Sequence, residues 1–185
     1  YILYGGMVHG LMYGYSLEAM RFKKSCSGGL FWMYNDAWGE VGWTIIDYYL
    51  RRKIPFYAVK RALAPVKLTM RLVDGKVVLQ GCNDTDRPVE VKGRFGYVSY
   101  DGKLDHTREI QLVLPPASRE YYLEEKPEKA DYQKGTYMFY CDNGKADNIS
   151  LRLYDNRELQ YEGSEVAVLK TEEYGDDKLV TVSAK

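Results

Sequence analysis

The hydrophobic periodicity of the chain changes at Pro65, and this change limits the possible folds more than any other feature. Before Pro65, apolar residues recur at steps of three and four, as on one face of an α-helix. After it, apolar and polar residues alternate, as they do in half-buried β-strands. The pattern therefore divides the chain into a helical part, residues 1–65, and a β part that begins at residue 66.

The helical part has the order helix, strand, helix. Residues 7–24 predict an amphipathic helix with an apolar face formed by Val8, Met12, Tyr15, Ala19 and Phe22. Leu30–Met33 is a short apolar run, typical of a strand buried on both faces of a parallel sheet. Pro55–Ala64 predicts a second helix, which Pro65 ends. Because such a strand needs neighbouring strands, these elements indicate the end of a larger α/β domain.

The β part predicts an antiparallel β-sandwich over residues 66–170. Its first two strands flank Asp74-Gly75, a dipeptide suited to a tight hairpin turn. Further strands are predicted at Val89–Ser99, Glu109–Leu114, Thr136–Cys141, Ile149–Tyr154 and Glu165–Leu169. Residues 124–134 are charged and predict a solvated loop. Residues 171–185, which alternate again from Lys178, predict the start of a further β module or an extra sandwich strand.

Composition argues against several classes of partner. Basic and acidic residues number 26 each, so the chain has no basic surplus for nucleic acid. No apolar run is long enough for a transmembrane helix, so no membrane partner is expected. The three cysteines and two histidines are scattered, so we expect neither a disulfide framework nor a metal site, and no cofactor. Nothing in the sequence indicates where the protein is located.

Residues 32–38 carry the side chains that best indicate a function. Two indoles, a carboxamide and a carboxylate follow the apolar run, at Trp32, Asn35, Asp36 and Trp38. Flat aromatic faces suit the apolar face of a pyranose ring, and short polar side chains suit its hydroxyl groups. Buried core tryptophans and a turn-forming aspartate would give the same pattern, so composition alone leaves both interpretations open.

Three blocks of sequence resemble the end of the catalytic barrel in the β-mannosidase-like branch of glycoside hydrolase family 2. Residues 29–38 read Gly-Leu-Phe-Trp-Met-Tyr-Asn-Asp-Ala-Trp, residues 43–48 read Trp-Thr-Ile-Ile-Asp-Tyr, and residues 57–65 end in Ala-Pro. The family has similar blocks in the same order at similar spacing. The Asn-Asp-Thr at residues 83–85 resembles a strand end of that family. The resemblance is strong over the first third of the chain and only a matter of pattern beyond it.

The resemblance implies a fold and a domain organisation. Residues 1–65 would be the C-terminal end of a (β/α)8 TIM barrel, with Leu30–Met33 as its eighth strand and Pro55–Ala64 as its closing helix. Residues 66–170 would be an immunoglobulin-like β-sandwich. The expected fold class is therefore an α+β fragment, a terminal helix–strand–helix followed by an antiparallel sandwich.

The resemblance also implies roles for residues 32–38, because barrel sites lie at the carboxyl ends of the strands. Trp32 would be the platform under the sugar in the cleavage subsite, and Trp38 would lie near the aglycone side. Asn35 and Asp36 would line the rim or hold the loop. Met33 stands where the family usually has Gln, which leaves the identity of the sugar open.

The chemistry of the family needs two carboxylates about 5 Å apart. By resemblance these would lie on the fourth and seventh barrel strands, upstream of Tyr1. Asp36, Glu40 and Asp47 have no partner at a recognisable catalytic spacing, so we expect no catalytic residue in this chain and no activity from it alone. The parent protein would be a retaining exo-β-glycosidase acting on a β-linked oligosaccharide or glycoside, with β-mannosidase as the leading specificity.

Two alternatives remain open at this point. The sandwich could be a non-catalytic carbohydrate-binding or spacer module, in which the candidate contacts are Tyr97, Tyr100, Tyr121 and Tyr122. The parent could also have another family 2 specificity, such as exo-β-glucosaminidase, β-galactosidase or glucuronidase. In either case, unmated barrel surface in residues 1–64 predicts self-association or partial disorder.

Overall fold

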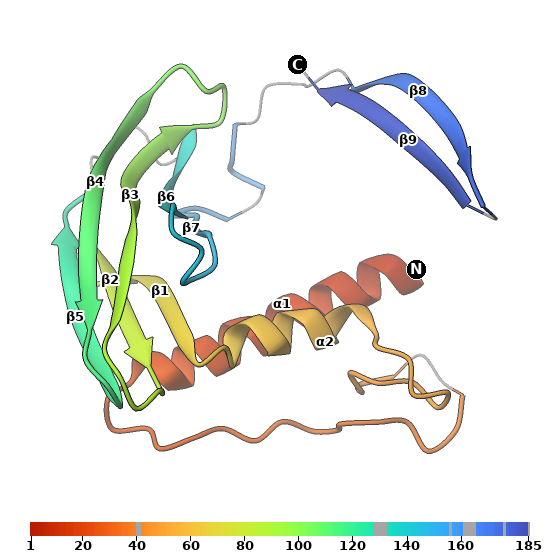
Figure 1. The fold of residues 1–185 in the computed structure, drawn as a ribbon, viewed down its shortest axis with the longest axis horizontal. Helices are drawn as coiled ribbons and strands as arrows, with labels where there is room; N and C mark the ends of the chain where they lie inside the picture. The colour runs from red at the N-terminus through yellow and green to blue at the C-terminus, as the bar shows by residue number, and fades with distance from the viewer. Residues whose placement is uncertain (40–41, 128–132, 156, 161–165, 176, 185) are drawn as a thin grey trace.

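A computed structural model of the chain describes residues 1–39, 42–127, 133–155, 157–160, 166–175 and 177–184. Two helices lie side by side below a β-sandwich, and a separate hairpin lies near the C-terminus (Figure 1). The elements are α1 (Ile2–Phe22), α2 (Ile54–Ala62), β1 (Val66–Val73), β2 (Lys76–Asn83), β3 (Val89–Ser99), β4 (Asp105–Leu114), β5 (Ser118–Glu125), β6 (Gly135–Cys141), β7 (Ile149–Leu151), β8 (Val166–Tyr174) and β9 (Asp177–Ala184). Within these ranges, no helix has both the length and the apolar character that crossing a bilayer requires.

The two predicted helices are present and pack against each other. Helix α1 begins five residues before the predicted start at residue 7 and ends at Phe22 instead of residue 24. Helix α2 begins at Ile54 and has its proline in the first turn, as predicted. A Cβ at Gly10 would lie only 3.4 Å from the Pro55 Cα, so glycine lets the helices approach closely. Between them lies a small core of Leu17, Ile45, Val59 and Ala62.

The strand predicted at Leu30–Met33 does not form. These residues make no β-ladder, and Leu30 is 98% exposed, so the prediction of a strand buried on both faces is wrong for this chain. The physical reason is that no strand of the described residues lies beside the segment to pair with its backbone groups. The apolar run instead follows an extended path from α1 toward residues 34–36, where one isolated bridge joins Asn35 to Ile46.

The sandwich has two antiparallel sheets with strand orders β1-β2-β5 and β4-β3-β6-β7. The Asp74-Gly75 hairpin is confirmed, with both turn residues at positive φ. Phe95 faces Phe139 across β3 and β6, and both side chains are fully buried. A Cβ at Gly93 would lie 2.7 Å from the Phe139 ring, so only glycine leaves room for that ring. The sheets enclose a core of Leu68, Met70, Val77, Leu79, Val91, Phe95, Tyr97, Leu112, Leu114, Tyr137 and Phe139.

Most of the predicted sandwich strands are confirmed, but β5 was not predicted. Its sequence, Ser-Arg-Glu-Tyr-Tyr-Leu-Glu-Glu, is too polar to show a clear alternation, yet it pairs with β2 along most of its length. Strand β7 ends at Leu151 and not at Tyr154. The loop predicted for residues 124–134 begins two residues later than predicted, because Glu124 and Glu125 belong to β5. Residues 128–132 lie outside the described ranges.

Strands β8 and β9 form a hairpin of their own, away from the sandwich (Figure 1). The predicted alternation from Lys178 is confirmed as β9. Its partner β8 contains residues 166–169 of the strand predicted at Glu165–Leu169, and Glu165 lies outside the described residues. The prediction that this strand belongs to the sandwich is wrong, because it pairs with β9 in a sheet of its own. One face of the hairpin carries Val166, Val168, Val180 and Val182, all exposed. The predicted domain boundary at residue 170 falls inside β8, and the domain division stays a prediction.

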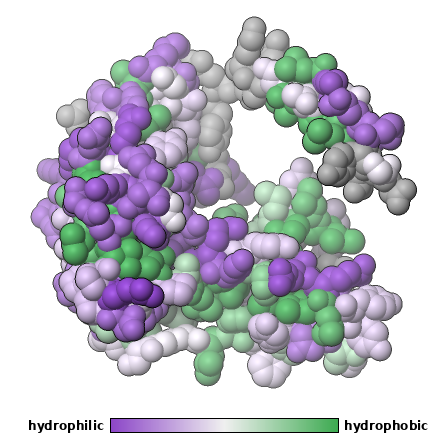
Figure 2. All heavy atoms as spheres, in the orientation of Figure 1, coloured by the Kyte–Doolittle hydropathy of each residue, from purple (hydrophilic) through white to green (hydrophobic). Residues whose placement is uncertain are grey.

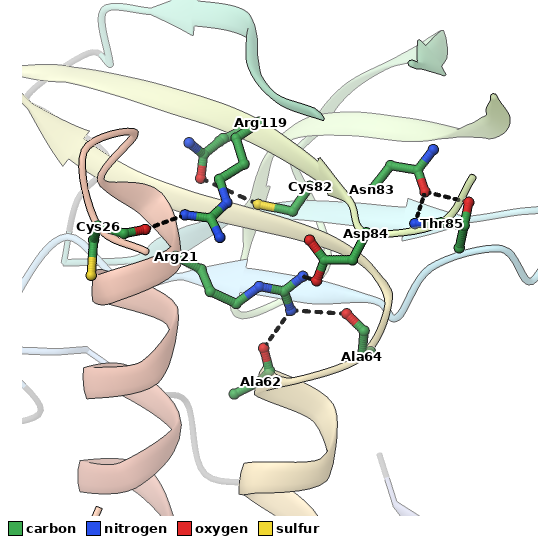
Figure 3. A network of polar contacts seen from close by, with 10 residues as sticks. Arg21, Cys26, Ala62, Ala64, Cys82, Asn83, Asp84, Thr85 and Arg119 are labelled. Carbon is green, nitrogen blue, oxygen red and sulfur yellow. Dashed lines mark hydrogen bonds and ion pairs between the residues drawn. The ribbon is translucent and has the colours of Figure 1, made fainter. Parts of the chain in front are cut away.

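A polar network joins the helical layer to the sandwich (Figure 3). The buried Arg21 of α1 donates to the carbonyl oxygens of Ala62 (2.7 Å) and Ala64 (2.8 Å) at the end of α2. Its other terminal nitrogen donates to Asp84 at 2.8 Å, in the turn that follows β2. Asn83, the last residue of β2, is fully buried, and its side-chain oxygen accepts hydrogen bonds from the backbone amide and the hydroxyl of Thr85. The Asn-Asp-Thr segment is therefore the corner of the sandwich that contacts α1 and, through Arg21, the end of α2.

Candidate functional site

The candidate site consists of residues 30–39 and 42–53, the described parts of the segment between α1 and α2. Its backbone is folded back on itself in three short stretches near residues 34–36, 44–46 and 52–53. The Asp36 amide donates to the Ile46 carbonyl at 3.0 Å, and the Lys53 amide donates to the Ile45 carbonyl at 2.9 Å. These bonds hold residues 34–36 against the start of α2 without regular secondary structure.

All three tryptophans of the chain lie on this segment and face solvent. Trp32 is 77% exposed, Trp38 is 67% exposed and Trp43 is 65% exposed. Tryptophan is normally highly buried on average, so three indoles exposed within a dozen residues point to a surface that contacts something else. Trp32 and Trp38 therefore have the exposure that a role in a binding surface requires. The interpretation of these residues as core aromatics is wrong.

Asp36 is in a different position from its neighbours, because its side chain is fully buried. Its Oδ2 lies 2.7 Å from the Lys53 ammonium, and its Oδ1 accepts a hydrogen bond from the Thr44 hydroxyl at 2.5 Å. Lys53 in turn donates to the Thr44 oxygen at 2.6 Å. Burial opposes ionisation of Asp36, but these contacts outweigh it and keep the pKa of the carboxyl below its usual value. Of the two roles expected for Asp36, the geometry favours holding the loop.

Asn35 is exposed beside Asp36. Its side-chain nitrogen makes a long, 3.3 Å contact with the Asp36 carbonyl, and its side chain is otherwise turned outward on the same loop as Trp32 and Trp38. Three of the four predicted sugar contacts are thus on the surface of one short loop, with the fourth beneath them.

Helix α1 supports the loop through Tyr13 and His9. The Tyr13 hydroxyl lies within hydrogen-bond distance of the carbonyl oxygens of Trp32 and of Trp43, the latter at 3.0 Å. The His9 ring packs on Tyr13 with centroids 4.2 Å apart and meets the Trp43 ring edge-on at 6.2 Å. Burial, with help from the Lys53 charge, lowers the pKa of His9, so the imidazole is neutral near pH 7.

The other carboxylates considered for catalysis have no catalytic geometry among the described residues. Asp47 pairs with Arg51 at 2.7 Å and accepts the Arg51 backbone amide at 2.8 Å. These bonds outweigh partial burial and lower the pKa of Asp47, which suits a structural ion pair and not a general acid. Glu40 lies outside the described residues. The described ranges also contain no cluster of three or more potential metal ligands.

Three of the four candidate tyrosines of the sandwich contact other parts of the protein. Tyr97 is buried in the core, Tyr121 stacks on Phe22 of α1 with centroids 5.2 Å apart, and the Tyr122 hydroxyl donates to the Val113 carbonyl at 2.9 Å. The residues that sequence reasoning missed are Lys53, Thr44, His9 and Tyr13. Their pairing with the loop depends on how the chain turns between residues 36 and 53, and no local pattern encodes that turn.

Comparison with known proteins identifies the relatives of the chain. No protein-family model matches it. It is 40% identical over 63 residues, 33% of its length, to proteins named Beta-mannosidase B from Emericella nidulans and from Aspergillus flavus. The solved structure of a β-D-mannosidase from Dictyoglomus thermophilum matches 97% of the chain with a TM-score of 0.80 and 27% identity.

Over the matched region, the chain is similar to β-mannosidases, which supports its resemblance to the β-mannosidase-like branch of glycoside hydrolase family 2. The resemblance in the sequence blocks is thereby confirmed, as is the fold class, an α+β fragment that resembles the C-terminal region of a family 2 β-mannosidase. The solved structure of the exo-chitosanase CsxA from Amycolatopsis orientalis matches 97% of this chain with a TM-score of 0.62, but at 14% identity this likeness shows the fold alone. The matched region is 8% of the fungal relatives and 23% of the Dictyoglomus enzyme.

Proposed function

We propose that the chain is the C-terminal part of a retaining exo-β-glycosidase, and that this enzyme is a β-mannosidase. Residues 1–65 complete its TIM barrel, residues 66–170 form an immunoglobulin-like sandwich behind it, and residues 171–185 start a further module. The observation that carries this proposal is that a β-D-mannosidase structure matches 97% of this chain, over 23% of its own length, at a TM-score of 0.80. The 40% identity over 63 residues to proteins named Beta-mannosidase B supports it.

In this proposal Trp32, Asn35 and Trp38 contact the sugar, and Asp36 holds the loop that carries them. The exposed indoles support the first assignment, since an aromatic face stacks on the C–H face of a pyranose while amide groups reach its hydroxyls. The buried ion pair with Lys53 supports the second. The nucleophile and the acid/base come from parts of the enzyme outside this chain.

The test is an assay with nitrophenyl β-mannoside in the full-length enzyme and in the isolated chain. We expect turnover by the full-length enzyme and none above blank by the chain. Replacing Trp32 by Ala in the enzyme should lower kcat/KM about tenfold through loss of an aromatic contact. Tyr140→Ala is the control, because Tyr140 is an exposed aromatic residue of the sandwich strand β6, outside the candidate site. Turnover by the chain alone, or equal effects of the two variants, would overturn the proposal.

The same assay decides between specificities. A full-length enzyme that prefers β-glucosaminides or β-galactosides over β-mannosides would replace β-mannosidase by another family 2 activity. Titration of the chain with manno-oligosaccharides addresses the alternative of a binding module. Binding that survives Trp32→Ala and is lost in Tyr100→Ala would place carbohydrate on the sandwich and contradict the role proposed for the loop.

We also expect the isolated chain to self-associate. Many apolar side chains of α1 and of the β8–β9 hairpin face solvent, and Figure 2 shows hydrophobic residues gathered over these elements. Light scattering should therefore report a mass above that of a monomer, and a clean monomer would contradict this expectation.

A further inference from the structure

The Asp36–Lys53 pair lies at the centre of the loop that carries the three tryptophans. Asp36 falls between Trp32 and Trp38, and Lys53 is the residue directly before α2. The ammonium contacts both the Asp36 carboxylate and the Thr44 hydroxyl, and that hydroxyl contacts the carboxylate, which closes a triangle of contacts at 2.5–2.7 Å. Three points of the segment, far apart in sequence, are thus fixed to each other by side chains.

An ion pair is not required at this position if the three side chains only stabilise the fold. Desolvating two charges largely cancels their attraction, and well-packed apolar side chains of similar size are often as stable or more so. The ion pair instead provides a defined geometry, because its contacts are satisfied in only one arrangement. Any arrangement that separated the pair would leave the Asp36 charge buried without a partner, which is unfavourable. Burial of the pair therefore points to positioning.

Lys53 is held in place by the packing of α2 against α1. Pro55 and Val59 of α2 are buried against α1, and a Cβ at Gly6 would lie 3.1 Å from the Ile54 side chain, so the helices touch at the point where α2 begins. The Lys53 amide also donates to the Ile45 carbonyl at 2.9 Å. The lysine can therefore transmit the position of α2 to the loop.

We propose that Lys53 is a positioning residue for the sugar site: it contacts no sugar and acts through Asp36 to hold the loop of residues 32–38 in its binding geometry. Its ammonium is already engaged by Asp36 and Thr44, and its side chain is only 20% exposed, so it is poorly placed to contact a ligand itself. The assignment to sugar rests on the proposed function, whereas the holding of the loop does not.

Tryptophan fluorescence tests the holding of the loop directly in this chain. Because its three tryptophans all lie between residues 32 and 43, selective excitation of indole reports on this segment and on nothing else. In Lys53→Met we expect the fast component of the tryptophan anisotropy decay to rise about twofold, since nanosecond loop motions become accessible. The matched control is Lys76→Met, which removes an exposed lysine of β2 that pairs with Glu124. That control should leave the decay unchanged.

A second variant separates positioning from folding. In Lys53→Met with Asp36→Leu no buried charge is left unpaired, so thermal stability should return close to that of the starting protein. If Lys53 positions the loop, the fast anisotropy component stays high in this double variant. In the single variant Lys53→Arg, which keeps the positive charge, the component should lie close to that of the starting protein. A normal decay in either methionine variant would overturn the proposal.

Activity of the full-length enzyme separates this inference from the proposed function. We expect Lys53→Met to raise KM for the glycoside more than it lowers kcat, because the platform for the sugar is loosened while the catalytic groups stay in place. A mobile loop with unchanged kinetic constants would leave the positioning of the loop intact and overturn its assignment to sugar. An unchanged anisotropy with altered kinetics would overturn the positioning role and leave the proposed function standing.

Discussion

The sandwich and the helical layer are held together in different ways. The sandwich encloses a core to which both sheets contribute, including the fully buried Phe95, Phe139 and Leu79. The helical layer has four buried core residues, and most apolar residues of its first helix are exposed: Ile2, Leu3, Tyr4, Met7, Val8, Leu11, Met12 and Tyr15. The geometry of the helical layer is fixed by specific polar contacts, the Arg21 network toward the sandwich and the Lys53 triangle within the loop. Apolar burial thus dominates one region, and paired charges fix the other.

The largest effect that tests the difference between the two regions should come from a cavity in the sandwich core. Phe95→Ala should lower the free energy of unfolding by about 3–5 kcal/mol, because it deletes a fully buried ring from a packed core. Met12→Ala, in the helical layer, is the matched control. Its side chain is more than half exposed, so we expect a change within about 0.5 kcal/mol. Urea unfolding measures both, and similar losses in the two variants would show that the regions do not differ as described.

Sequence predicted the sandwich better than the helical layer, for a physical reason. Strand pairing such as that of β1 with β2 follows from local alternation and from the Asp74-Gly75 turn, both of which can be read along the chain. Leu30–Met33 has an equally clear apolar signature, but whether it pairs depends on strands elsewhere. The polar strand β5 was missed for a related reason, since its pairing with β2 and not its own pattern makes it a strand.

The candidate site was predictable in its exposed part only. Trp32 and Trp38 stood out because their residue types match a known family in order and spacing. Lys53 did not, because nothing in its local sequence distinguishes it from an exposed lysine that precedes a helix. Asp36 was expected to line the rim or to hold the loop, and only the burial of its carboxylate separates these roles. Contacts between residues far apart in sequence, and not residue types, decide which side chain supports and which one binds.

The junction between the two regions should be the next most sensitive point. Arg21→Met removes three charge-assisted hydrogen bonds and leaves the carbonyl oxygens of Ala62 and Ala64 without a partner, which should cost about 3 kcal/mol. Asp84→Asn keeps an acceptor for Arg21 and is half-exposed, so it should cost about 1 kcal/mol. Tryptophan fluorescence reports the helical layer, and amide hydrogen exchange of β3 and β6 reports the sandwich, so the two measurements at each urea concentration follow the two regions separately. Coincident transitions in Arg21→Met, at unchanged midpoint, would contradict this role of the junction.

A weaker effect should appear as the pH is lowered, and it should be confined to the helical layer. The pKa of His9 is lowered in the folded protein from 6.5, so the unfolded chain takes up the proton first. The contribution of His9 is therefore complete above about pH 6.5 and is lost as the pH falls through the lower folded value. His9→Phe should remove this dependence in unfolding followed by tryptophan fluorescence between about pH 8 and pH 5. A slope that persists in the variant would assign the effect to another group.

The smallest expected effect distinguishes two ion pairs of equal length. Lys76–Glu124 within the sandwich and Lys67–Glu18 between β1 and α1 both have nitrogen–oxygen distances of 2.9 Å. The first pair is about half exposed on both sides, whereas the Lys67 side chain is 4% exposed. Glu124→Gln should therefore change the free energy of unfolding by less than about 1 kcal/mol, and the change should vanish in high salt. Glu18→Gln should cost more and resist salt, since it leaves the Lys67 ammonium buried without its counter-charge. Equal costs would mean that charge pairing at the junction carries no more stability than charge pairing on the open surface of the sandwich.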